Sequence, residues 1–220
     1  MEKKSSILIF FLFSLFIGSL FYFYSIQLKK SRAPASKEEI FSDAISRELR
    51  EKTLNLFKEN SLAEEISDFV LMGNLFEGTS EYGKIYLKNL ENLNQNPFLT
   101  FFAVRERIGK ISPEDFFIRG RLLDLVDKLE IPTDRKIEFF GEQILRKIEF
   151  DNEGYLSDDS KNITQAMTYF RQYSKEESDI LKYANTALIL NQDNKKAQDQ
   201  LISRFKIYFP KAAKNLQRTQ

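Results

Sequence analysis

Two residue types that perform much of enzyme chemistry are absent from this chain of 220 residues. It contains no cysteine and no histidine. Without them there is no thiolate nucleophile, no disulfide, no imidazole base and none of the common zinc sites. Any catalysis would therefore have to use carboxylates, lysine, tyrosine or a phosphate-binding loop.

One segment has the spacing of a phosphate-binding loop. Residues 78–85 read GTSEYGKI and match G-x-x-x-x-G-K, but Ile85 stands where a hydroxyl should reach magnesium. Such a loop also needs a strand before it and a helix after it, and no parallel-sheet pattern surrounds this one. We interpret the segment as an interhelical loop, and a nucleotide-binding enzyme as the third-ranked function.

An acidic segment is the other candidate for chemistry. Residues 151–154, DNEG, are followed by Asp158 and Asp159, without the alternating oxygen ligands and distal glutamate of an EF-hand. We interpret it as a solvated loop. The sequence therefore predicts no catalytic, cofactor-binding or metal-binding residue and no cofactor, it assigns no binding residue, and the chain is not expected to be an enzyme.

The body of the chain carries repeated helix-start signals. A serine with an acid three residues later can satisfy the free amide groups at the start of a helix. Three segments have this pattern and a fourth has proline at the first helical position. They begin at Ser36, Ser61, Ser174 and, with the proline, Ser112.

Apolar residues recur with the period of an amphipathic helix. Ile137, Phe140, Ile144, Leu145 and Ile148 mark one face of such a helix, and no strand alternation of comparable length is evident. The sequence predicts an all-α body whose short connections favour antiparallel helical hairpins. The predicted helices span residues 37–59, 62–72, 80–93, 97–109, 113–130, 134–150, 161–173, 175–190 and 195–209.

The segment Tyr183–Ala197, YANTALILNQDNKKA, resembles the junction between two tetratricopeptide repeats. In that family a helix ends in Ala-Leu-x-Leu, a polar turn follows, and the next helix begins with a small residue. Gln192 replaces the usual proline, and Ile180 stands where a small residue is expected. The resemblance, mainly over residues 161–210, implies a hairpin stack that binds peptides or proteins; an irregular all-α domain is the alternative.

The first residues have the features of a membrane anchor. Residues 7–28 form an uncharged stretch of 22 residues. This length is sufficient for a transmembrane helix and exceeds the apolar region of a signal peptide. Ala33-Pro34-Ala35 leaves a cleaved leader as the alternative. The predicted organisation is therefore a polar tail, an anchor, a basic juxtamembrane linker and an all-α domain, at residues 1–6, 7–28, 29–36 and 37–220.

Positive charge is concentrated at the two ends of the chain. The overall charge is +1, but residues 1–35 carry +4 and residues 195–220 carry +6. The positive charges on the two sides of the anchor are nearly balanced, so they do not decide its orientation. A short N-terminal tail usually leaves the following domain on the far side of the membrane. We therefore expect a protein of the bacterial cytoplasmic membrane with its body outside the cytoplasm. The basic C-terminal helix could contact anionic lipid, and nucleic acid is not an expected partner.

These observations predict a single-pass, membrane-anchored helical scaffold or adaptor that binds an unidentified protein partner near the bilayer. The alternative is a self-associating structural subunit of a membrane assembly, which would form homo-oligomers. The two differ in whether the surface of the body meets another protein or a second copy.

Overall fold

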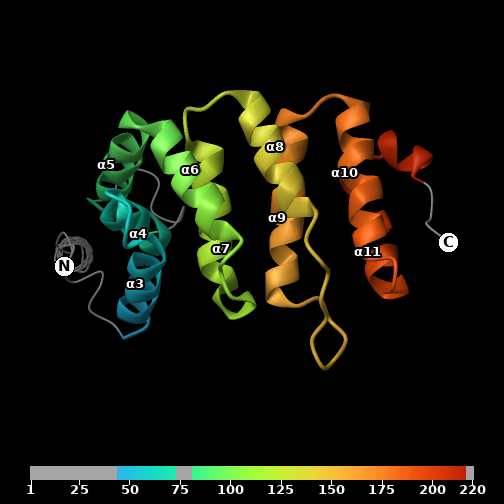
Figure 1. Cartoon of the computed structure of the whole chain (residues 1–220), viewed down its shortest axis with the longest axis horizontal. Helices are drawn as coiled ribbons and strands as arrows, with labels where there is room; N and C mark the ends of the chain where they lie inside the picture. The colour runs from blue at the N-terminus through green and yellow to red at the C-terminus, as the bar shows by residue number, and fades with distance from the viewer. Residues whose placement is uncertain (1–43, 73–80, 217–220) are drawn as a thin grey trace, which may run out of the picture. The chain divides into compact units, whose positions relative to one another are not determined.

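The computed structural model describes residues 44–72 and 81–216, and these form α-helices joined by short connections (Figure 1). The predicted tail, anchor and linker lie outside the described residues. Within the described part there are nine α-helices and two 3₁₀ helices. The elements are α3 (Ala44–Phe57), α4 (Ala63–Met72), α5 (Glu81–Gln95), α6 (Pro97–Ile108), η2 (Pro113–Asp115), α7 (Phe116–Lys128), α8 (Thr133–Ile144), α9 (Asp158–Tyr173), α10 (Glu177–Leu190), α11 (Lys195–Tyr208) and η3 (Ala212–Asn215).

The predicted all-α class is confirmed for the described residues, and the two boundaries between α8 and α9 were predicted too far along the chain. Helix α9 begins at Asp158 instead of residue 161. Helix α8 ends at Ile144 instead of continuing to residue 150. The chain turns back after it through an isolated antiparallel bridge between Phe150 and Leu156. Apolar Ile148 is buried all the same. Ile148 fits the apolar spacing of the helix although it lies beyond the end of α8, and for this reason the predicted helix was too long.

None of the helices within residues 44–72 and 81–216 combines the length and the apolar character that crossing a bilayer requires.

The caps of three helices are set by single polar side chains. Ser112 Oγ accepts from the Glu114 N–H at the start of η2, as the sequence predicts. The prediction at Ser174 was wrong, because this residue ends α9 by donating its N–H to the Phe170 carbonyl and makes no cap for α10. The effective caps further along are Ser157 for α9 and Asn194 for α11.

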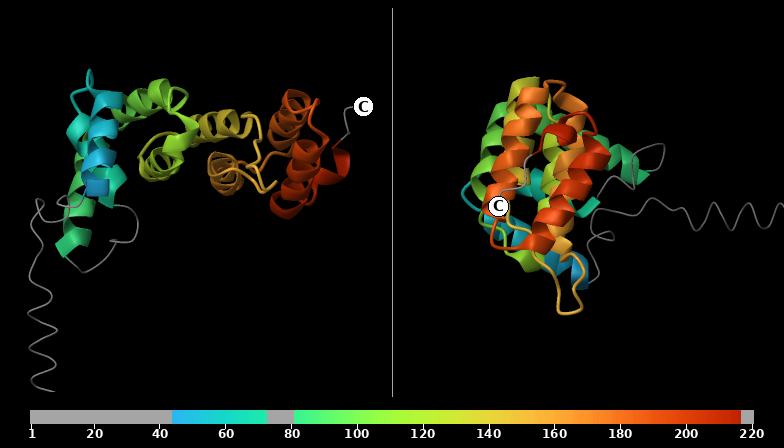
Figure 2. Two further views of the ribbon diagram at one scale, coloured as in Figure 1. Left: turned by 90° about the horizontal axis from the view of Figure 1, so that it is seen from below. Right: turned by 90° about the vertical axis from the view of Figure 1, so that its right-hand side faces the viewer.

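Helices α6 to α11 are arranged as neighbouring hairpins. Helices α8 and α9 pack along their length, as do α7 and α9, and α10 contacts both α8 and α11 (Figures 1 and 2). Phe101 of α6 meets Phe139 of α8 edge-on, with ring centroids 5.8 Å apart. Phe140 contacts Tyr169 and Tyr173 of α9, which continues the aromatic core into the next helix.

The approach of α10 to α8 depends on a glycine. A Cβ atom at Gly141 would lie 2.3 Å from Cζ of Tyr183, well inside van der Waals contact. The Tyr183 ring therefore occupies the space that any side chain at position 141 would need. Burial raises the pKa of the Tyr183 phenol, with Glu142 and Glu138 acting in the same direction.

We predict that Gly141→Ala destabilises the protein by about 1–3 kcal/mol, because the new methyl group overpacks the α8–α10 contact. Urea unfolding followed by circular dichroism measures the change. Gly109→Ala is the matched control, since a Cβ there meets nothing within 4 Å. Equal effects at the two glycines would contradict the packing described.

Candidate binding groove

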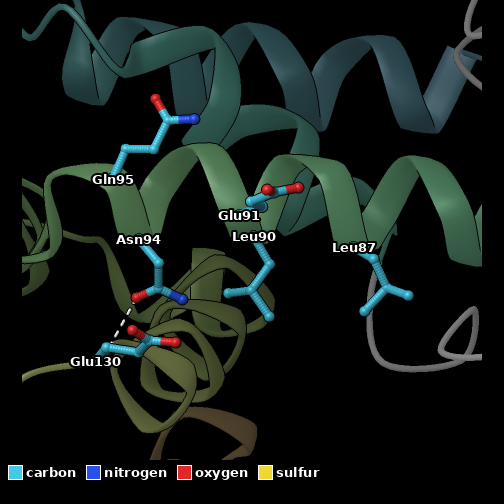
Figure 3. Close-up of a pocket in the computed structure, with 6 residues that line it drawn as sticks. All are labelled: Leu87, Leu90, Glu91, Asn94, Gln95 and Glu130. Carbon is cyan, nitrogen blue, oxygen red and sulfur yellow. Dashed lines mark hydrogen bonds between the residues drawn. The ribbon is translucent and has the colours of Figure 1, made fainter.

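A hollow of about 380 Å³ lies along α5 where this helix meets the end of α7 (Figure 3). We call it the α5 groove. Leu87 and Leu90 form its apolar part, and the remaining lining residues carry amides or carboxylates. The groove is lined by Leu87, Leu90, Glu91, Asn94, Gln95 and Glu130.

The positions of these residues on α5 decide what the groove presents. Leu87, Leu90 and Asn94 follow one another at helical spacing and project toward the same side of α5, where Glu130 lies (Figure 3). Leu87 is 51% exposed although it is a large apolar side chain. Tyr86 and Leu93, on the adjoining face of the same helix, are fully buried. The groove therefore has an apolar floor and a rim whose only charges are carboxylates.

Asn94 fixes the wall of the groove. Its Oδ1 accepts a hydrogen bond from the Glu130 N–H at 2.7 Å, and its Nδ2 donates to the Lys128 carbonyl at 3.3 Å. The last carbonyls of a helix lack partners within the helix, and one side-chain amide here serves both a carbonyl and an N–H at the end of α7. The Asn94 side chain therefore joins α5 to a segment 36 residues further along the chain.

Helices α7 and α9 meet through polar groups, which we call the polar seam. Five hydrogen-bonded pairs connect them, and the residue numbers rise together on both helices, so α7 and α9 run parallel. The pairs are Asn162 Nδ2 to the Phe116 carbonyl at 2.9 Å, Gln165 Nε2 to the Gly120 carbonyl at 3.0 Å and to Asp124 Oδ1 at 2.5 Å, Tyr169 Oη to Asp124 Oδ1 at 2.5 Å, and Tyr173 Oη to Asp127 Oδ1 at 2.8 Å.

The two tyrosines of the polar seam hold their protons strongly. Burial raises the pKa of Tyr169 and of Tyr173, and the hydrogen bond from each phenol to its aspartate raises it further. Lys136 of α8 adds a donor to this end, with Nζ 2.7 Å from the Asp127 carbonyl and 3.2 Å from Tyr173 Oη. Burial lowers the pKa of the Lys136 ammonium. The tyrosine, aspartate and lysine side chains of the polar seam thus bind one another, as is typical of side chains that hold helices together.

A buried ion cluster closes the other end of α9. Asp159 accepts from Arg119 of α7 and from Arg146, which follows α8, while Arg119 also donates to the Ile111 carbonyl. Burial lowers the pKa of Arg119 to about 10, and the neighbouring Arg146 charge acts in the same direction. Both carboxylate oxygens are thus occupied. The cluster fixes α9 against the two preceding helices.

The structure bears on the two segments that the sequence offered as candidates for chemistry, the phosphate-loop-like segment and the acidic segment. Among the described elements, helix α4 is the one that precedes the phosphate-loop-like segment, and residues 73–80 lie outside the described part. In the acidic segment, Asp151 Oδ1 accepts from the N–H groups of Glu153 and Tyr155, forming a closed turn. Across the described residues, no three of the Asp and Glu side chains gather as metal ligands would.

Sequence reasoning missed both the α5 groove and the polar seam. The seam left a usable signal, because Asn162, Gln165, Tyr169 and Tyr173 recur at helical spacing as a polar face of α9. The groove left none, since its wall depends on an amide 36 residues away from the backbone it binds. The segment that resembles a tetratricopeptide junction spans the end of α10, a turn and the start of α11.

Comparisons with models of known families, with curated proteins and with solved structures find no match to this chain.

We predict that Asn94→Ala lowers stability by about 1–3 kcal/mol, because it removes two hydrogen bonds and leaves the end of α7 without a partner. Faster hydrogen exchange at the Glu130 amide is the local measurement. Gln95→Ala, at the adjacent exposed position, should change stability by less than about 0.5 kcal/mol. If Glu130 exchange is unchanged in Asn94→Ala, the amide does not hold the wall.

The seam tyrosines predict a loss of stability in alkali. An unfolded tyrosine loses its proton near pH 10, whereas Tyr169 and Tyr173 keep theirs in the folded protein. At these two tyrosines the folded state therefore binds more protons than the unfolded state above about pH 10, and their contribution to stability falls as pH rises. Urea unfolding at several pH values measures this slope, which Tyr173→Phe should reduce; an unchanged slope would contradict the assignment.

Proposed function

We propose that this protein is a membrane-anchored helical scaffold or adaptor that binds a protein partner near the bilayer. The α5 groove is the observation that carries the proposal. It exposes leucine side chains beside polar groups on a helix whose other face is buried. Large exposed apolar groups rimmed by polar residues are typical of interaction sites.

A helix is the partner element that such a groove fits. Leu87 and Leu90 lie three residues apart on one helix, and apolar positions of this spacing receive the apolar face of a second helix. The carboxylates of Glu91 and Glu130 at the rim favour a partner segment that carries lysine or arginine beside its apolar positions. The hairpin arrangement of α8 to α11 supports a repeat-like scaffold of the kind that the tetratricopeptide resemblance implies.

The anchor is the second part of the proposal. Residues 7–28 would hold the chain in the membrane, with the body on the far side of the bacterial cytoplasmic membrane. The linker that follows is short enough to keep the body close to the surface. A partner bound in the α5 groove would consequently be recruited to the bilayer.

We predict that a photo-crosslinking amino acid at Leu87, in the full chain within its native membrane, forms a discrete adduct with another protein. The same group at Ile207, which is 67% exposed on α11, should form none. Leu90→Asp should remove the Leu87 adduct, because a carboxylate at this position disrupts the apolar part of the groove.

Two results would count against this assignment. An adduct whose mass is that of two copies of the chain would favour the self-associating subunit. Equal labelling from Leu87 and Ile207, or none from either, would contradict a specific groove.

A further inference from the structure

Helix α6 is apolar on the face that points away from the core as well as on the face that packs into it. Phe98, Leu99 and Phe102 are 47%, 48% and 52% exposed, and we call them the α6 face. On the other side of the same helix, Phe101 and Val104 are fully buried. A helix that is apolar all round is normally covered on all sides, so the α6 face requires an environment other than water.

The first two turns of α6 expose no polar side chain. Thr100 is the only polar side chain among residues 97–104, and it is fully buried, donating its hydroxyl to the Leu93 carbonyl at 3.0 Å. Protein interfaces of ordinary size carry about ten hydrogen bonds and a polar rim. The hollow of the α5 groove does not include the α6 face. A helix face without exposed polar side chains fits hydrocarbon better than it fits a protein.

The helix changes character where headgroups would begin. Its last turn carries Arg105, Glu106 and Arg107, after eight residues without charge, and both arginines are paired with carboxylates of the protein: Arg105 with Glu138 and Glu142, Arg107 with Glu59. The apolar part of α6 therefore ends at a turn whose charges are neutralised within the protein, and phenylalanine and leucine are the apolar residues typical of segments that lie in the membrane interface.

The length of the chain before the described residues supplies the remaining argument. Fifteen residues, 29–43, separate the end of the predicted anchor from Ala44. Even fully extended they span roughly 50 Å, at about 3.3–3.6 Å per residue. The body is therefore held at a high effective concentration beside the bilayer, where a modest apolar surface is enough to bind.

We propose that the α6 face docks on the lipid bilayer, with Phe98, Leu99 and Phe102 inserted at the level where headgroups meet acyl chains. This inference rests on the anchoring part of the proposed function. It adds a second membrane contact, made by the folded body, which would restrict how the α5 groove is presented to a partner.

The absence of tryptophan from the chain allows a direct test. Single-tryptophan variants Phe102→Trp and Phe98→Trp of the full chain are reconstituted into vesicles of phosphatidylcholine and anionic phosphatidylglycerol that contain lipids brominated near the top of their acyl chains. Phe21→Trp, within the predicted anchor, reports insertion of the anchor. Tyr155→Trp, in the acidic loop and 69% exposed, is the matched surface control. Circular dichroism confirms that each variant keeps its helix content.

We expect a blue-shifted emission that brominated lipid quenches for Phe102→Trp or Phe98→Trp, and no quenching for Tyr155→Trp. Quenching at neither α6 position, with Phe21→Trp quenched, would overturn docking and leave the anchor intact. A blue shift without quenching would mean that protein covers the α6 face, and would also overturn the proposal. Quenching of Tyr155→Trp to the same extent would show that contact with lipid is not specific to α6.

The test separates this inference from the proposed function. If Phe21→Trp is not quenched, the anchor itself fails, and the docking proposal that rests on it fails with it. Ile207→Trp reports the competing contact by the basic C-terminal helix. If Ile207→Trp is quenched and neither α6 variant is, then α11 and not α6 contacts the lipid, and docking by α6 is overturned.

Discussion

The parallel packing of α7 on α9 is the constraint on which the arrangement of the other helices depends. Five hydrogen-bonded pairs hold this contact, and the ion cluster around Asp159 holds its beginning. Buried polar groups lose several hydrogen bonds to water, so they tolerate only the register in which each finds its partner. Helix α8 is fixed by the same contacts, because Lys136 and Arg146 reach the two ends of the seam.

The α5 groove follows from the position that the seam gives α7. The groove exists because the end of α7 stops beside α5, where Asn94 binds its backbone. The aromatic contacts from Phe101 through Phe139 and Phe140 to Tyr169 connect this region with the rest of the core. A rigid body of this kind offers a partner a preformed surface, which lowers the entropy that binding must overcome.

Local patterns allowed the helices to be predicted and long-range contacts set the rest. Apolar periodicity located the described helices, because burial of one helix face depends on spacing within the segment. The caps were less certain, since Ser174 and Ser157 have the same local chemistry and only the path of the chain decides which begins a helix. The groove and the close contact of Gly141 with Tyr183 join positions 36 and 42 residues apart, and no local pattern records such distances.

The proposed function depends first on attachment to the membrane, which can be measured from the cell fraction that holds the chain and from the mass of the chain. We expect the protein to stay in the membrane fraction after a wash with alkaline carbonate, to be extracted by detergent, and to keep its full mass of 25.9 kDa. A shorter chain that begins after Ala35 and is recovered without detergent would contradict it. In that case the opening segment is a cleaved leader, and the α6 face needs another cover.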